Sequence, residues 1–369
     1  MKKIVHIITG LNNGGAEMML YKLLLNIDKS KYNIEVISMT DDGVFADKIR
    51  ELDIKVTSLN MKRGIPSLRG IFKSVQIVKG SDFVQTWMYH ADLFGFIVCK
   101  IAGIKNIIWG IHHSNLDKDK NKRLVLIIAK INSYLSRYTY KIVSCSNYAT
   151  NIHVSSGYDQ SKFVNIPNGF DLDLYFKVKN AKEDLCNELN IDKDSKIICH
   201  VARWDILKDY KTLIKSLSIV NEKYNNIKFI LCGPNIDNDN EELSNMLKNK
   251  GINEDTLLLG RRTDIPKIMS ASDILVLSSS GEAFPNVIGE AMACETPCVV
   301  TDVGDCKFIV DKYGAIAEKQ NPKSLAIAIE SILDLSNDEI EELGKNARNR
   351  VINNFDIHKV VKMYEKLYY

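Results

Sequence analysis

Short apolar runs alternate with segments of helical periodicity along the first half of the chain. The helical patterns, in which apolar residues recur every three or four positions, lie near residues 18–25, 44–52, 68–79 and 92–102. The apolar runs lie at residues 2–9, 32–39, 55–59, 83–86, 106–111 and 142–146. This alternation predicts a parallel sheet with helices packed against it.

The same alternation starts again after a polar segment at residues 177–194, which we interpret as a hinge. New apolar runs follow at residues 196–203, 228–232, 256–259, 274–277 and 298–301, and closing helical patterns at 323–335, 337–353 and 358–368. A chain of 369 residues is long enough for two domains. We therefore predict two α/β domains, residues 1–176 and 177–356.

Composition is that of a globular protein, with 45% hydrophobic and 26% charged residues. The apolar stretches are too short, or too interrupted by lysines, to span a membrane, and the first residues lack the apolar run of a signal peptide. We therefore expect a cytoplasmic protein. The eight cysteines include no C-x-x-C pair, which predicts buried thiols, with neither a disulfide framework nor a zinc site.

Charge is distributed unevenly along the chain. Residues 1–175 carry 23 Lys/Arg against 15 Asp/Glu, whereas the remainder is acidic. A basic half suits nucleic acid or an anionic membrane, and the aromatic interleaving of a single-strand binder is missing, so we expect no nucleic acid partner. Residues 118–141 place seven basic residues around apolar ones. This segment is either a helix lying on an anionic membrane or a core helix with a solvated basic face.

Residues 278–305 contain the strongest chemical signal. An apolar run ends in Ser-Ser-Ser-Gly, Glu282 follows, Pro285 opens a helical pattern, and Glu290 lies about one turn into it. The unpaired amides of a first helical turn attract an anion, and carboxylates accept hydrogen bonds from hydroxyls. Together these groups suit a nucleotide sugar. The alternative is two solvated glutamates beside an ordinary helix.

Two cations lie beside another predicted helix entrance. Arg203 ends the apolar run at 196–203, and Lys208 precedes the helical pattern that follows. An arginine fork and a lysine point charge can neutralise a diphosphate. Isolated charges of this kind are more often ordinary surface residues.

Glycines and histidines follow predicted strands of the first half. Gly14 and Gly15 are adjacent, which favours a ligand loop over a plain turn, and their spacing is not that of a dinucleotide fingerprint. His112 and His113 come directly after the run at 106–111. A histidine there can act as an acid, a base or a polar anchor, or it can be structural.

The sequence of residues 281–294, Gly-Glu-Ala-Phe-Pro-Asn-Val-Ile-Gly-Glu-Ala-Met-Ala-Cys, resembles the two-glutamate signature of glycosyltransferase family 4. Residues 203–209 and 165–171 also resemble motifs of that family. The resemblance implies the GT-B fold, with two Rossmann-like domains facing each other across a cleft. It further implies that the last helix, within residues 357–369, packs back onto the first domain.

The resemblance also implies roles for the residues of the donor site. Arg203 and Lys208 would bind the diphosphate, Glu290 the ribose, and Glu282 the hydroxyls of the transferred sugar. The site would be completed by the backbone of Phe284, Pro285, Asn286 and Val287.

In the first domain, the resemblance places Gly14 and Gly15 near the transferred sugar and the acceptor. It also implies a histidine facing the sugar, for which His113 is the first choice and His112 the second. Fixed positive charge at the diphosphate replaces a metal in this scheme. We therefore expect no metal and no cofactor apart from the nucleotide-sugar donor.

The predicted function is that of a retaining glycosyltransferase. It would move a hexose or N-acetylhexosamine from a nucleotide sugar, with UDP preferred, to a glycan or polyprenyl-linked acceptor in surface polysaccharide synthesis. The predicted location is the cytoplasm, with association at the inner face of the membrane as one possibility. A nucleotide-sugar 2-epimerase of the same fold and a non-catalytic nucleotide-sugar-binding protein are the alternatives.

Overall fold

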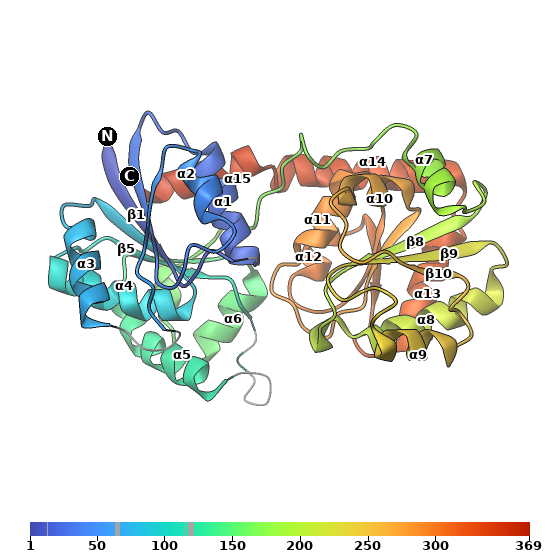
Figure 1. Ribbon diagram of the computed structural model, residues 1–369, viewed down its shortest axis with the longest axis horizontal. Coiled ribbons are helices and arrows are strands. Elements are labelled where there is room, and N and C mark those ends of the chain that lie inside the picture. Colours follow the sequence, from blue (N-terminus) through green and yellow to red (C-terminus); the bar gives the residue numbers. More distant parts are fainter. Residues whose placement is uncertain (13, 63–66, 115, 117–121) are drawn as a thin grey trace. The chain divides into compact units, whose positions relative to one another are not determined.

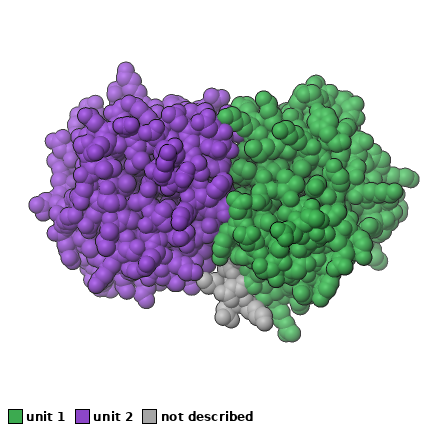
Figure 2. Space-filling view, turned by 180° about the vertical axis from the view of Figure 1, so that it is seen from behind, with its two compact units in different colours: residues 1–169, 357–369 green, residues 170–356 purple. Residues whose placement is uncertain are grey.

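The computed structural model describes residues 1–12, 14–62, 67–114, 116 and 122–369. The chain folds into two compact units: unit 1 comprises residues 1–169 and 357–369, and unit 2 comprises residues 170–356 (Figure 2). The division falls after residue 169 and not after residue 176. The cause is bonding within unit 2, where the Phe170 N–H donates to the Phe355 carbonyl (2.8 Å) and Ser270 Oγ donates to the Phe176 carbonyl (3.1 Å).

Unit 1 is built on a parallel sheet. Its strands, in sheet order, are β3 (Lys55–Ser58), β2 (Tyr32–Ser38), β1 (Lys2–Ile8), β4 (Phe83–Trp87), β5 (Ile107–Ile111), β6 (Lys141–Ser144) and β7 (Phe163–Asn165). The helices of this unit are α1 (Gly15–Asn26), α2 (Ala46–Arg50), α3 (Leu68–Val78), α4 (Tyr89–Ala102), α5 (Arg123–Leu135), α6 (Asn147–Ser155) and α15 (Ile357–Leu367).

Helices cover both faces of this sheet (Figure 1). Successive side chains of a strand point to opposite faces, and β1 feeds two cores in this way. Ile4 and Ile8 belong to the core that also contains the buried residues of α1, α2 and α15, whereas Val5 and Ile7 belong to the core beneath α3 and α4. Burial on both faces explains why β1 is an almost unbroken apolar run.

Unit 2 is built on a second parallel sheet. Its strands, in sheet order, are β10 (Thr256–Leu258), β9 (Ile227–Cys232), β8 (Lys196–Val201), β11 (Ile274–Leu277), β12 (Cys298–Thr301) and β13 (Gly314–Ala317). The helices of this unit are α7 (Ala181–Leu189), α8 (Tyr210–Lys223), α9 (Glu241–Lys248), α10 (Ile265–Ala271), α11 (Asn286–Ala293), α12 (Cys306–Val310), α13 (Pro322–Leu333) and α14 (Asn337–Asn354).

The polar segment at 177–194 is not an unstructured hinge, because it contains helix α7. Ala181, Leu185 and Cys186 are buried on one side of this helix, which packs against α10. The pattern of these three residues within a polar segment was too weak for helix α7 to be predicted from the sequence. All eight cysteines are buried, as predicted.

Candidate functional site

The order in which the chain adds strands to the sheet of unit 2 reverses between β8 and β11, at the centre of the sheet. We call this place the switch point of the sheet. From β8 the chain moves outward to β9 and β10, whereas from β11 it moves the other way to β12 and β13. The loops after β8 and β11 therefore diverge at the carboxyl edge, and this is where open α/β sheets bind ligands. Arg203 and Lys208 follow β8, and Glu282 follows β11.

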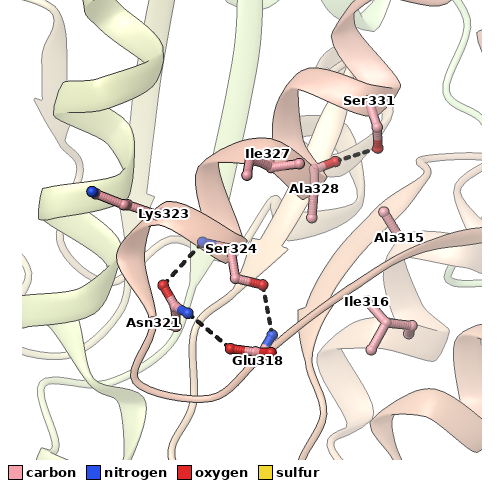
Figure 3. A pocket seen from close by; sticks show the side chains of 9 residues that line it. All are labelled: Ala315, Ile316, Glu318, Asn321, Lys323, Ser324, Ile327, Ala328 and Ser331. Atoms are coloured by element: carbon pink, nitrogen blue, oxygen red, sulfur yellow. Dashed lines mark hydrogen bonds between the residues drawn. The ribbon is translucent and has the colours of Figure 1, made fainter.

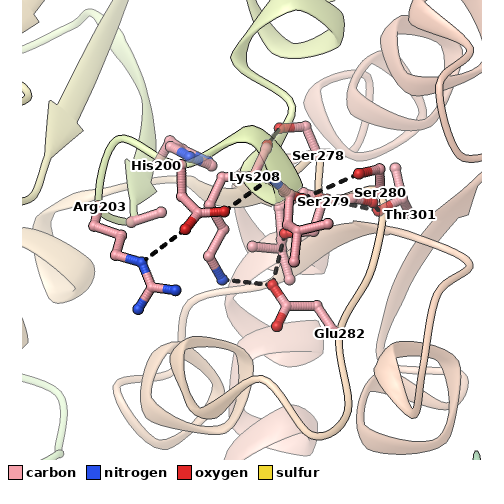
Figure 4. A network of polar contacts seen from close by, with 12 residues as sticks. His200, Arg203, Lys208, Ser278, Ser279, Ser280, Glu282 and Thr301 are labelled. Atoms are coloured by element: carbon pink, nitrogen blue, oxygen red, sulfur yellow. Dashed lines mark hydrogen bonds and ion pairs between the residues drawn. The ribbon is translucent and has the colours of Figure 1, made fainter. Parts of the chain in front are cut away.

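The structure brings Lys208 and Glu282 together. Lys208 Nζ lies 2.5 Å from Glu282 Oε1, and both side chains are largely buried, with 19% and 14% of their surface exposed (Figure 4). Ser279 Oγ donates to the same carboxylate oxygen at 2.7 Å. Because Ser279 also holds the Glu282 carboxylate, the Lys208 ammonium that pairs with it has a fixed position.

Asp205 organises the turn that carries the two cations. One carboxylate oxygen accepts from the Leu207 N–H (2.9 Å) and caps the short 3₁₀ turn Ile206–Lys208. The other accepts from Arg203 Nε at 3.1 Å (Figure 4). Arg203 is more exposed than Lys208, with 63% of its side-chain surface in solvent, and this contact does not involve its Nη nitrogens.

A serine run fastens the two loops to each other. Ser278 Oγ donates to the Lys208 carbonyl (2.8 Å), and the Ser280 N–H donates to the Leu207 carbonyl (2.8 Å). Thr301, at the end of β12, donates through Oγ1 to the Ser279 carbonyl at 2.6 Å. The backbone around Lys208 is thus fixed from β11 and β12, and the cation does not depend on its own loop alone.

Gly304 allows the loop after β12 to pack closely against Glu282. Its φ is +55°, and a Cβ there would lie 2.4 Å from the Glu282 carbonyl oxygen. The next residue, Asp305, donates its N–H to the Ala283 carbonyl at 2.9 Å. Only glycine meets both the backbone conformation and the close approach without strain.

Helix α11 begins directly after the loop that follows β11, with Pro285 as its N-cap residue. Asn286 and Val287 form its first turn, so their amides lie at the helix N-terminus as predicted. The Phe284 ring is buried and stacks on Phe170 (6.3 Å between ring centroids). Phe284 therefore anchors the loop through the core, and its backbone is the part available to a ligand.

Glu290 has a different neighbour from Glu282. It lies on α11 and is hydrogen-bonded to Tyr175, whose pKa is raised by burial and by the charge and hydrogen bond of Glu290. Gly289 precedes it, and a Cβ at this position would lie 2.1 Å from the Phe170 ring. The two glutamates are thus eight residues apart in sequence but have separate partners in unit 2.

His200 lies in β8, close to the turn that carries Arg203 and Lys208 (Figure 4). Its Nδ1 is 2.8 Å from the Val276 carbonyl, and its buried Nε2 has no hydrogen-bond partner among the described residues. Burial, opposed by the hydrogen bond and assisted by the charge of Lys208, lowers the pKa of His200 to about 4. A neutral imidazole adds no positive charge to the site at neutral pH.

In unit 1, Gly14 and Gly15 lie at the start of α1, following the carboxyl edge of β1. Gly14 is the N-cap residue, and a Cβ there would lie 2.2 Å from Glu17 Oε2. Glu17 therefore folds over the helix N-terminus, where a negative charge is favoured. Gly15 has open space where its Cβ would lie.

His112 and His113 follow β5 at the same edge of the sheet, and both are half-buried. The His112 ring is stacked on Trp87, with 4.9 Å between ring centroids, and burial lowers its pKa to about 4. Neither of its nitrogens has a partner within the described part of the chain. His113 is half-buried and lies edge-on to Tyr89 (6.3 Å).

A separate pocket of about 420 Å³ lies beside β13 and α13 and contains none of the predicted site residues (Figure 3). Its polar groups support local structure. Asn321 accepts from the Ser324 N–H at the start of α13 (3.1 Å), and Ser324 Oγ accepts from the Glu318 N–H (3.0 Å).

The described residues contain neither a cluster of metal ligands nor a helix suited to span a membrane. Within them, His, Cys, Asp and Glu side chains form no group of three or more suited to a metal ion. None of the helices there combines the length and hydrophobicity of a membrane span. Part of the basic segment at 118–141, including Lys118 and Lys120, lies outside the described residues.

Sequence reasoning missed Asp205, Ser279 and Thr301. The Asp205 side chain accepts from the N–H of Leu207, two positions later, which is the usual spacing of an Asx turn, so this turn could have been predicted locally. Ser279 and Thr301 gave no such signal, because their contacts depend on which strands are neighbours.

Family models match both halves of the chain. One described as Glycosyltransferase Family 4 matches residues 13–174, and one described as Glycosyl transferases group 1 matches residues 181–350.

Two of the curated relatives are bacterial transferases that cover most of the chain. The chain is 27% identical to UDP-Gal:alpha-D-GlcNAc-diphosphoundecaprenol alpha-1,3-galactosyltransferase of Escherichia coli, over 89% of this chain and 84% of the relative. It is 25% identical to N,N'-diacetylbacillosaminyl-diphospho-undecaprenol alpha-1,3-N-acetylgalactosaminyltransferase of Campylobacter jejuni, over 97% of each chain.

Among solved structures, Anabaena HepE in complex with UDP and glucose has the same fold, with a TM-score of 0.85 and 21% identity over 99% of both chains. A glycosyltransferase from Rickettsia africae has a TM-score of 0.84 and 18% identity, over 100% of this chain and 98% of the other. The two parallel sheets, the two family models and these relatives all indicate the same fold and the same class of enzyme. The chain has the GT-B fold and belongs to the glycosyltransferases, with a family 4 domain followed by a group 1 domain.

Proposed function

We propose that the protein is a retaining glycosyltransferase that moves a hexose or N-acetylhexosamine from a UDP-sugar to a lipid-linked glycan at a membrane surface, in surface polysaccharide synthesis. The observation that carries the proposal is the Lys208–Glu282 pair at the switch point of the second sheet. A cation and a carboxylate at one ligand position match a donor with phosphates and sugar hydroxyls.

Each group has a role in this reaction. Lys208 and Arg203 hold the diphosphate, and Glu282 accepts hydrogen bonds from the sugar hydroxyls. The amides of Asn286 and Val287 add positive potential at the start of α11. Glu290 binds the ribose, and its bond to Tyr175 fixes its orientation.

The chemical step breaks the bond between the anomeric carbon and the diphosphate oxygen, which keeps the electron pair. The acceptor hydroxyl oxygen bonds to the anomeric carbon, and its proton is released as UDP leaves. Charge grows on the diphosphate while an oxocarbenium-like centre forms. Lys208, fixed by Glu282 and by its carbonyl contact with Ser278, stabilises that charge without reorganisation.

Unit 1 supplies the acceptor side in this proposal. Gly15 leaves space at the start of α1 for a ligand to approach the backbone. His113 is the better candidate to contact the sugar, because the His112 ring is stacked on Trp87 and its two ring nitrogens are buried. The names of the E. coli and C. jejuni relatives support a polyprenyl-diphosphate acceptor, and the UDP complex of HepE supports a UDP donor.

A donor panel tests the proposal. The protein is incubated with UDP-glucose, UDP-galactose, UDP-GlcNAc, UDP-GalNAc and, as a non-uridine control, GDP-mannose, with and without diphosphoundecaprenol-linked sugars. We expect UDP release that requires the acceptor, together with a product whose anomeric configuration matches that of the donor. Formation of an epimer without acceptor, or binding without turnover across the panel, would contradict it.

A further inference from the structure

One face of α5 leaves large apolar side chains in solvent. Leu124, Ile127, Ile131 and Tyr134 are 46%, 48%, 41% and 60% exposed, and Tyr138, just after the helix, is 58% exposed. These residues are three and four positions apart, so they form a continuous stripe. We call them, together with the basic residues described next, the apolar-basic face.

The basic residues of this face run beside the stripe. Arg123, Lys130 and Arg137 are exposed and seven positions apart, which places them on one side of the helix. Lys130 Nζ lies 5.1 Å from the centre of the Tyr134 ring, a cation–π distance. Lys100 of α4 lies 5.7 Å from the Tyr138 ring, so α4 extends the same surface.

Acidic residues are absent from α5 and from the segment that follows it. The sequence from residue 123 to residue 158 contains no Asp or Glu. A solvated helix face normally mixes charges of both signs. Asp159, just beyond this stretch, interacts electrostatically with Arg137. The face therefore combines apolar area with an excess of positive charge.

The opposite side of α5 is fixed to unit 1. Ile128 and Ala129 are buried beside Tyr89, and Asn132 Nδ2 donates to the Tyr89 carbonyl at 3.0 Å. The helix cannot turn its apolar stripe inward without breaking these contacts. One side of α5 is therefore core, as in the second interpretation of this segment, and the side that remains outside is apolar as well as basic.

We propose that the apolar-basic face binds the surface of an anionic phospholipid bilayer. Apolar side chains in a single stripe would enter the boundary between headgroups and acyl chains, while Arg and Lys meet lipid phosphates. Tyrosine suits this boundary because its ring is apolar and its hydroxyl is polar. An excess of positive charge is the complement of an anionic leaflet.

A bilayer explains the face better than a protein partner does. The exposed apolar residues run along the whole length of α5, and Arg123, Lys130 and Arg137 flank them. The inference rests on the proposed function only in that a lipid-linked acceptor would lie in the same membrane. Binding to vesicles that contain no acceptor therefore tests the face independently of the reaction.

The test is vesicle flotation with the full chain. Vesicles contain phosphatidylcholine alone or with 30% phosphatidylglycerol. One variant replaces apolar residues (Ile127→Ser, Ile131→Ser, Tyr134→Ser), and another replaces charges (Arg123→Gln, Lys130→Gln, Arg137→Gln). The matched control, Ile327→Ser with Lys323→Gln, removes an exposed isoleucine and an exposed lysine from α13 of unit 2.

We expect the wild-type chain and the control to float with anionic vesicles, less so as salt rises, and each α5 variant to bind at least tenfold more weakly. Circular dichroism and acceptor-independent UDP binding report whether the variants are folded. Unchanged flotation of both variants would overturn the proposal. So would wild-type self-association in sedimentation velocity that the variants abolish without any vesicle binding, because the occupant would then be a second copy.

Discussion

Lys208 is the cation that the surrounding residues hold most firmly. Its Nζ contacts Glu282, its carbonyl accepts from Ser278 Oγ, and its N–H donates to the Asp205 carbonyl at 3.0 Å. Among the described residues, the Arg203 side chain pairs with Asp205 while 63% of its surface is exposed, and exposed ion pairs of this kind contribute little. At the scale of single residues, the donor site therefore depends most on Lys208.

Replacing Lys208 with methionine tests this ranking. The side-chain volume is kept and the charge is lost, so we expect kcat/KM for the donor to fall about 100-fold or more. Lys211→Met is the matched control, because Lys211 is exposed on the next helix turn. If UDP release by the two variants differs by less than about threefold, Lys208 does not stabilise the diphosphate.

A second prediction concerns His112 and the pH dependence of the free energy of unfolding. Its pKa is about 4 when folded and 6.5 in the ordinary state, so between these values the unfolded chain binds more protons. Stability contributed by neutral His112 is complete above pH 6.5 and is lost as pH falls toward 4. At pH 5 the loss from this one group is about 2 kcal/mol.

The measurement is urea unfolding at pH 7 and pH 5 for the wild type and His112→Phe, which keeps a ring on Trp87. Other buried groups of unit 1, such as His6, His153 and Asp92, titrate in both proteins and cancel in the comparison. We expect the variant to lose about 2 kcal/mol less than the wild type on acidification. An equal loss would mean that His112 is not held neutral.

At the scale of elements, the loops after β8, β11 and β12 form one unit of structure. Backbone and serine contacts join the first two loops, and Gly304 brings the third against Glu282. The donor site is therefore built by short loops on a rigid sheet edge, and a shift of one loop is passed to the others.

Gly304→Ala tests this coupling. The new Cβ would meet the Glu282 carbonyl at a residue with φ of +55°, so we expect a loss of about 1–3 kcal/mol in the stability of unit 2, and a fall in activity. Gly281→Ala is the control in the same region, since its nearest contact would be an ordinary 3.7 Å to Leu207. Similar unfolding midpoints for the two variants would contradict a special role for Gly304.

At the scale of the whole molecule, the chain forms unit 1, then unit 2, and returns to unit 1 at residue 357. Ile357, Val360, Val361, Tyr364 and Tyr368 are buried in the same core as the residues of α1 and β1. The core of unit 1 therefore needs residues 357–369 as well as residues 1–169, and the stability of the unit depends on both segments.

A chain ending at residue 356 should lose the fold of unit 1. Each of the five buried side chains contributes about 1.5–3 kcal/mol, and together they approach the whole stability of a domain. Hydrogen exchange should show loss of protection across residues 1–169 with protection kept in 170–356. Deleting only Tyr369, which is 77% exposed, should leave protection intact; a protected unit 1 in the long truncation would refute the dependence.

Local pattern determined much of this protein. The alternation of apolar runs and helical periods predicted the two parallel sheets, and the run at 298–301 has the bounds of β12. These features could be predicted because strand and helix periods depend on neighbouring residues. The motif at 281–294 likewise placed Glu282 after a strand and Asn286 at a helix start, and its resemblance to family 4 indicated a glycosyltransferase, which the family models confirm.

Only the tertiary structure decided which of these residues meet. Lys208 and Glu282 are joined across 74 positions because β8 and β11 are neighbours, and strand order is not written in local periodicity. The same holds for His112, whose ring is stacked on Trp87, and for the return of residues 357–369 to unit 1. Contacts between distant residues depend on the packing of whole elements, so the sequence determined the parts of the site and the fold determined their arrangement.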